Sequence, residues 1–314
     1  MLKRNLIQVT FLTKIKARRE SGFLLRKNGT FIFKVSIISI LKYIKKGNNM
    51  LSLDQIESNW NKLLGFIEDG FEGERKQGLL TLYNEHADRI AAAPASAKVY
   101  YHSAFLGGYV HHVLNILRIA PRMSTLWESL GGEKIWTDEE LFFVALNHDL
   151  GKIGDVENEY YLETTEDWKT KRGIQFDYNP VLPYMKVQDR SLFLLQHYGI
   201  KMTQREFMAI QLHDGLYEEG NKAYYMHYSP SFELDRFIHV VHFADMFASK
   251  LEYEEWAKSP EGKQFLKGES KLKPKTLKGK KSLDKILNNE ELKDENLKVK
   301  SFEDLFGNVF GETK

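Results

Sequence analysis

The strongest chemical signal in the sequence is an imidazole and a carboxylate that directly follow an apolar run. Residues 142–147 are mostly apolar and lead into His148 and Asp149. Burying such a pair beside a core is costly unless a partner binds it, and a divalent metal ion is a natural partner. Lys152 follows three residues after Asp149, where its ammonium can reach a phosphate that the metal polarises.

Two further segments place ionisable side chains in apolar surroundings. Asp245 lies within the apolar segment 239–246, where an unpaired carboxylate is expensive, so we expect it to face a cation. His213 ends a segment that begins with a capping box at Thr203 and Glu206. His242 precedes Asp245 by about one helical turn and is a candidate to support the site from behind.

At these positions the chain resembles the HD superfamily of metal-dependent phosphohydrolases, over about residues 95 to 250. The family's order of ligands is a histidine, a His-Asp pair and a distant aspartate. Its first motif, two glycines, two apolar residues, any residue and then histidine, selects His112 over His111. The resemblance therefore implies one divalent metal ion held by four side chains: His112, His148, Asp149 and Asp245.

The segment from His102 to Leu114 is most similar to the HD domain of bacterial 3′-to-5′ exoribonucleases. Some family members add two histidines that bind a second metal ion. The later one matches His213, but Val187 stands where the earlier one is expected. The number of metal ions stays open at this point, and the ion itself can be Mn²⁺, Fe²⁺, Co²⁺, Ni²⁺, Zn²⁺ or Mg²⁺.

The resemblance implies hydrolysis by water that the metal ion activates. In this interpretation Asp149 orients the water, and Lys152 and His213 stabilise the charge that develops. We expect His102, Lys152 and Arg118 to contact the substrate, although pairing with an acid is an alternative role for Arg118.

The leading functional hypothesis is cleavage of a phosphate ester or anhydride bond of a nucleotide. The nucleotide-monophosphatase members carry glutamate at the position of Lys152, which disfavours that subclass. The alternatives are a 3′-to-5′ exonuclease acting on single-stranded nucleic acid, a mixed-valence di-iron oxygenase and a non-catalytic interaction protein.

The elements that position these residues are expected to be helices. Apolar residues recur every three or four positions from residue 51 to about 257, without sustained alternation. The sequence therefore predicts an all-α fold, an HD-type helical bundle domain over residues 50–257. A loop is expected from Asp155 through Pro183.

Composition limits the chemistry and the partners. The chain has no cysteine, which excludes thiolate metal sites and thiol nucleophiles. Residues 51–262 hold 20 basic and 33 acidic side chains, a net charge of −13. A body this acidic is unlike a general nucleic-acid binder, which needs a basic face.

The ends of the chain differ from this body. Residues 1–49 form a basic extension, interpreted either as an over-long gene prediction, since Met50 opens a normal helix start, or as a flexible peripheral arm. Residues 258–300 have the composition of a charged linker. Residues 301–314 form a short apolar-acidic motif, of which 301–306 resemble the peptides by which replication proteins of T4-like phages bind the sliding clamp, although a small amphipathic helix is the alternative. No segment is long enough to span a membrane, and we expect a cytoplasmic protein.

Overall fold

The computed structural model describes residues 51–226 and 235–272, and these residues confirm the all-α expectation. The predictions for residues 1–49 and 301–314 lie outside the described residues. The longer helices are α3 (Leu53–Gly70), α4 (Gly73–Glu85), α6 (Gly108–Ser129), α7 (Asp138–Asn147), α9 (Val187–His197), α10 (Gln204–Leu212), α12 (Arg236–Lys258) and α13 (Pro260–Leu272). Shorter helical turns lie between them: α5 (Ala87–Ala92), η1 (Leu150–Ile153), α8 (Asp167–Lys171), η2 (Gly215–Tyr217), η3 (Glu219–Asn221) and α11 (Lys222–Met226).

Three of the longer helices begin with a complete capping box. In each, a serine or threonine side chain accepts from the backbone N–H three residues on, and a glutamine or glutamate there accepts from the cap's own N–H. The pairs are Ser52 with Gln55, Thr137 with Glu140, and Thr203 with Glu206. These caps satisfy backbone donors that a helix start leaves unpaired, and the one at Thr203 confirms the prediction made from the sequence.

Helices α7 and α10 are tied together at their beginnings. The Thr203 hydroxyl donates to Glu140 at 3.1 Å, and Arg205 Nη1 donates to the other oxygen of the same carboxylate at 3.4 Å. At the far ends of the two helices, the rings of His148 and His213 lie 4.8 Å apart between centroids. The two helices therefore run side by side in the same direction and deliver their last residues to one place.

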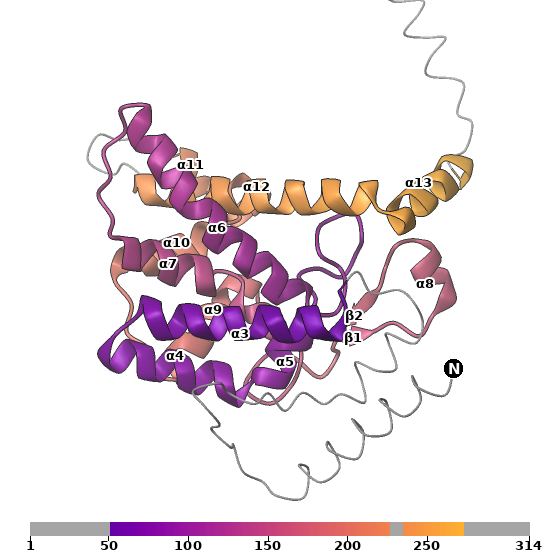
Figure 1. Cartoon of the computed structure of the whole chain (residues 1–314), viewed down its shortest axis with the longest axis horizontal. Helices are drawn as coiled ribbons and strands as arrows, with labels where there is room; N and C mark the ends of the chain where they lie inside the picture. The colour runs from indigo at the N-terminus through magenta and orange to yellow at the C-terminus, as the bar shows by residue number, and fades with distance from the viewer. Residues whose placement is uncertain (1–50, 227–234, 273–314) are drawn as a thin grey trace, which may run out of the picture. The chain divides into compact units, whose positions relative to one another are not determined.

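Helix α6 packs against both α12 and α7 (Figure 1). The inward faces of α6 and α12 carry fully buried apolar side chains, such as Val113 of α6 and Phe237 and Ala244 of α12. They join one continuous core with α3, α4, α7, α9 and α10. Because His112 and Asp245 lie on these apolar faces, the packing that buries the core also carries both side chains inward.

The segment expected as a loop contains ordered structure. Strands β1 (Tyr161–Glu163) and β2 (Phe176–Tyr178) pair antiparallel, and α8 lies between them in sequence. The sequence prediction missed this ribbon because three-residue strands are too short to display an alternating pattern. Phe176 is buried against Ala97, so the ribbon has a small apolar anchor.

The predicted linker from residue 258 also starts with regular structure, since α13 occupies Pro260–Leu272. The Ser259 hydroxyl accepts from the backbone N–H of Gly262, and Pro260 stands at the first helical position, a strong start signal. The chain divides into compact units after Lys263. Among the described helices, none has the length and apolarity to cross a bilayer.

Candidate metal centre

His148 caps the C-terminal end of α7 and its ring is held in one tautomer. Its Nδ1 lies 3.1 Å from the carbonyl oxygen of Ala145, which can only accept, so Nδ1 carries the hydrogen. The Nε2 atom is then a lone pair when the ring is neutral. This atom is buried and has no hydrogen-bond partner among the described residues.

His213 is held in the same way at the end of α10. Its Nδ1 donates to the carbonyl oxygen of Ile210 at 2.8 Å. Its own carbonyl accepts from Nδ1 of His242 at 2.7 Å, so His242 contacts the backbone of His213. The Nε2 atom of His213 faces Asp149 Oδ1 and Asp214 Oδ1, each at 3.6 Å.

His112 comes from the first turns of α6 and is completely buried. Its Nδ1 lies 3.0 Å from Glu252 Oε1, so this nitrogen donates. Its Nε2 lies on the opposite side of the ring, 3.1 Å from Asp245 Oδ1 and 3.6 Å from Asp149 Oδ2. Neither contact has the angles of a hydrogen bond. His111, the alternative, contacts Asn115 and the ring of Phe105 instead.

The carboxylates of Asp149 and Asp245 lie between these three rings. His148 Nε2 is 3.4 Å from Asp149 Oδ2 and 4.0 Å from Asp245 Oδ1. Ligand atoms within 4.8 Å of one another form overlapping groups, among them His112, His148 and Asp245, and His148, Asp149 and His213. The structure thus brings together the four side chains that the HD resemblance names, and His213 with them.

The donor set of this cluster fits a divalent metal ion. Imidazole lone pairs and carboxylate oxygens are both acceptors, so at these separations they repel each other unless a cation or a proton lies between them. Nitrogen and carboxylate oxygen are also the ligands that first-row divalent ions accept. The buried, unpartnered Nε2 atoms of His112 and His148 point to the cation.

In the metal-free protein, protons on two of the histidines reduce the repulsion between these acceptor atoms. Burial disfavours the charged form of His112, but Glu252 and Asp245 outweigh it and raise its pKa to about 10. Burial opposes protonation of His213 too, yet Asp214 and Asp149 raise its pKa to about 10. Both rings therefore hold a second proton at neutral pH, and an ion that binds His112 has to displace the proton on its Nε2.

Lys152 supplies a fixed positive charge beside the cluster. Its ammonium lies 2.5 Å from Asp149 Oδ2. Burial acts against the charged lysine, but the nearby Asp149 carboxylate raises the lysine pKa above its usual value. Burial likewise acts against the carboxylate of Asp149, and the Lys152 ammonium together with the neighbouring imidazoles of His148 and His213 holds its pKa well below the usual range. Both members of the pair are charged at neutral pH.

Of the two remaining predicted residues, His102 lies at the His/Asp cluster and Arg118 lies outside it. The His102 ring lies 4.5 Å from the His112 ring between centroids, with a buried Nε2 that has no hydrogen-bond partner among the described residues. Burial and the charges of His112 and Lys152 lower its pKa to about 3, so it is neutral. Arg118 is exposed and donates to Asn115 Oδ1 at 3.3 Å, outside the His/Asp cluster.

The sequence prediction missed Glu252, which holds His112 from behind. Its carboxylate accepts from Nδ1 of His112, from the Ser103 hydroxyl at 2.6 Å and from the Asn115 amide at 2.9 Å. The charge on His112 and these donors overcome the effect of burial and lower its pKa to about 2. Glu252 follows Asp245 by seven residues on α12, two helical turns on the same face, and this spacing was the available signal.

Helix α9 supports the turn that carries Asp149 and Lys152. The Ser191 hydroxyl donates to the carbonyl of His148 at 3.1 Å and accepts from the N–H of Gly151 at 2.7 Å. A Cβ atom on Gly151 would lie 2.1 Å from the carbonyl oxygen of Val187, so only glycine allows this approach. Val187, at the position of a family histidine, thus contributes backbone packing here.

The side chains of the cluster differ in their exposure to solvent. The side chain of Asp149 is 5% exposed, whereas that of Asp214 is 42% exposed, and those of Asp245 and Lys152 have intermediate values. Asp214 is therefore the most exposed of these carboxylates.

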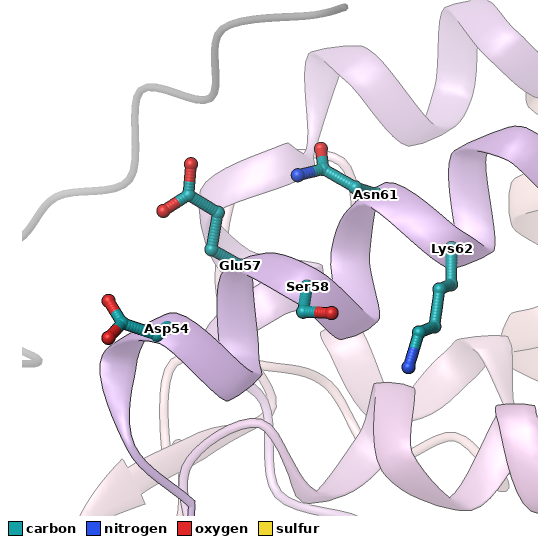
Figure 2. A pocket seen from close by; sticks show the side chains of 5 residues that line it. All are labelled: Asp54, Glu57, Ser58, Asn61 and Lys62. Atoms are coloured by element: carbon teal, nitrogen blue, oxygen red, sulfur yellow. The ribbon is translucent and has the colours of Figure 1, made fainter.

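A separate pocket lies on α3, lined by five side chains of that helix alone, as Figure 2 shows: Asp54, Glu57, Ser58, Asn61 and Lys62. Their spacing places them on one outward face of the helix. Acidic and basic groups are mixed there, and none of the predicted site residues contributes, so we assign this pocket no chemistry.

Comparisons with protein-family models, with curated proteins and with solved structures found no match for this chain. The case for a metal centre therefore depends on the geometry of the His/Asp cluster.

Proposed function

We propose that this protein is an HD-type metal-dependent phosphohydrolase that cleaves a phosphate ester or anhydride bond of a nucleotide. The observation that carries the proposal is a buried set of inward-facing imidazole nitrogens and carboxylates with a lysine ammonium 2.5 Å from one of the carboxylates. A metal ion and a fixed ammonium side by side form a site for an anion with several oxygens, and phosphate is such an anion.

The metal-holding residues in this proposal are His112, His148, Asp149 and Asp245. A divalent ion bound there lowers the pKa of water and withdraws charge from a phosphoryl oxygen. Glu252 orients His112, since it fixes the hydrogen on Nδ1 and leaves Nε2 for the ion.

The other residues act on the substrate. Hydrolysis forms a new bond from a water oxygen to phosphorus, breaks the bond from phosphorus to the leaving oxygen, and returns a proton to that oxygen. In this proposal Asp149 accepts a hydrogen bond from the water. Lys152 and His213 lie next to Asp149 and stabilise negative charge on the phosphoryl oxygens. His102 is a neutral donor or acceptor at the edge of the cluster.

The experiment is an incubation of the metal-reconstituted protein with nucleotides, cyclic nucleotides and short oligonucleotides, followed by identification of the products. Release of phosphate or pyrophosphate from nucleotides supports the proposal. Stepwise shortening of oligonucleotides supports the exonuclease alternative instead. Absence of both activities, in a protein that binds no metal ion, would contradict the proposal and favour an interaction protein.

A further inference from the structure

Three tyrosine rings gather on the β1–β2 ribbon. Tyr161 and Tyr178 are directly paired across the two strands, so their side chains share one face of the ribbon. Their ring centroids are 5.7 Å apart, and Tyr160 lies 4.7 Å from Tyr161 and 5.2 Å from Tyr178. These separations are those of interacting aromatic rings. We call Tyr160, Tyr161 and Tyr178 the tyrosine cluster.

The tyrosine cluster is fixed beside the turn that carries the metal-centre residues. The guanidinium of Arg190 lies 4.6 Å from the ring centroid of Tyr160, and Nη1 of the same side chain donates to the carbonyl oxygen of Gly151 at 3.3 Å. Arg190 is buried. One rigid side chain therefore links the tyrosine cluster to the residue that precedes Lys152.

Electrostatics agrees with this placement. Burial raises the pKa of the Tyr178 phenol above its usual value, Tyr160 and Tyr101 act in the same direction, and the Lys152 ammonium opposes them. Burial also raises the pKa of Tyr161, with a contribution from Asp149. Tyr178 and Tyr161 thus lie within electrostatic reach of the Lys152–Asp149 pair.

The outer ring of the tyrosine cluster is uncovered. Tyr178 is 59% exposed, whereas Phe176, two residues earlier on the same face of β2, is 3% exposed. The ribbon therefore presents an aromatic face to solvent, and Arg190 links this ribbon to the turn that carries Lys152. A flat aromatic group that carries negative charge complements both features, because its ring stacks on tyrosine while its charge meets the lysine.

We propose that the tyrosine cluster stacks the base of the nucleotide whose phosphate meets Lys152, with Tyr178 as the contacting ring. The inference rests on the proposed function and deepens it, since it assigns the base a site and makes base-bearing phosphates the preferred substrates. Purine nucleotides gain more than pyrimidine nucleotides, because their larger rings cover more of the tyrosine face.

The test compares Tyr178→Ala with Tyr178→Phe, which keeps the ring, in the full chain. Tyr184→Ala is the matched control, since Tyr184 is 92% exposed and follows in the same segment. The probes are adenosine 5′-triphosphate and inorganic tripolyphosphate, which lacks a base, and their Kd values are measured by calorimetry on the metal-free protein. Tyr178→Ala is expected to raise the Kd of the nucleotide roughly five- to a hundredfold and to leave that of tripolyphosphate unchanged. Tyr178→Phe and Tyr184→Ala stay close to wild type for both probes.

Equal Kd changes for the two probes, or none for the nucleotide, would overturn the stacking proposal. Circular dichroism and the thermal midpoint of each variant show whether it is folded, and Tyr178→Leu, which keeps apolar bulk without an aromatic face, replaces Tyr178→Ala if that variant unfolds. Failure of the proposed function has a different signature, which is ring-dependent nucleotide binding without hydrolysis by the metal-loaded enzyme. Hydrolysis that is equal for nucleotide and tripolyphosphate, and unaffected by Tyr178→Ala, would leave the phosphohydrolase in place and remove the base site.

Discussion

The chain contains two His-Asp pairs built in the same way, His148–Asp149 after α7 and His213–Asp214 after α10. Both helices start with a threonine–glutamate capping box, and both histidines donate from Nδ1 to the carbonyl three residues earlier. A short 3-10 turn follows each pair. Local sequence and local geometry therefore hardly distinguish them.

The aspartates of the two pairs differ in their surroundings. Asp149 is buried among the rings of His112, His148 and His213 and pairs with Lys152, whereas Asp214 contacts His213 and is exposed to solvent. A His-Asp dipeptide therefore becomes a candidate metal site only when other helices place further ligand side chains beside it. Here α6 and α12 bring His112 and Asp245 to the first pair.

The most direct test of the difference between Asp149 and Asp214 is to neutralise each aspartate in turn. Asp149→Asn is expected to lower kcat/KM roughly a thousandfold, because it removes a proposed metal ligand and the partner of Lys152. Asp214→Asn is expected to lower kcat/KM by less than about tenfold, since solvent screens this exposed carboxylate and Asp149 still favours the charged form of His213. Steady-state hydrolysis by the two metal-reconstituted variants gives both numbers. Equal losses would mean that the second pair also holds a metal ion.

Removing the support behind His112 should produce the next largest effect. Glu252→Gln keeps the size of the side chain but loses the charge that fixes the ring, so metal affinity is expected to fall roughly 10- to 100-fold. Glu254→Gln is the control, because Glu254 lies on the same helix and pairs with Lys258 on the surface, and it should leave affinity unchanged. A Glu252→Gln protein with wild-type affinity would show that His112 needs no orienting acceptor.

The raised pKa values predict how the metal centre responds to pH. His112, with a pKa of about 10, is protonated at pH 7, so metal binding at this ring releases a proton and apparent affinity rises with pH, about tenfold per unit for each proton displaced. Calorimetry in two buffers of different ionisation enthalpy counts the protons. Affinity that is flat between about pH 6 and 9 would contradict these protonation states.

The same pKa values set the stability of the metal-free protein. A histidine with a folded-state pKa of about 10 contributes stability that is fully present below its unfolded pKa of about 6.5 and is lost as pH rises towards 10. The thermal midpoint of metal-free protein is therefore expected to fall across this window, and metal ion should remove most of the decline. A midpoint that rises from about pH 7 to 9 would have the wrong sign.

The smallest expected effect concerns the turn after the first pair. Gly151→Ala brings a Cβ against the Val187 carbonyl and should destabilise the fold by roughly 1 to 3 kcal/mol. Gly65→Ala, in a helix and without a heavy atom within 4 Å of the added Cβ, is the control and should stabilise by about 0.5 to 1 kcal/mol. Urea unfolding measures both, and a neutral Gly151→Ala would mean that α9 moves freely away from the turn.

Much of the fold was predictable, because helical periodicity and capping boxes are local properties of the sequence. The all-α fold and the helix ends at His148 and His213 follow from such signals. The β1–β2 ribbon could not be predicted from local signals, because its strands are only three residues long. It gains its order from Phe176 and Arg190, which contact distant parts of the chain.

The candidate site was predictable where residue type and family order coincide, at His112, His148, Asp149 and Asp245. Glu252 was missed because one glutamate among several on a charged helix surface looks solvated, and only the packing of α12 against α6 turns it towards His112. The exposed position of Arg118 depends on the same packing, which spacing along one helix cannot specify.

The most direct measurement of the central claim is a titration of the metal-free wild-type chain with Co²⁺, followed by its visible absorption, alongside the Asp245→Asn variant. Our account predicts saturable binding with an absorption band of nitrogen- and oxygen-ligated cobalt, lost or greatly weakened in Asp245→Asn while helical content stays the same. Identical weak binding by both proteins would contradict it.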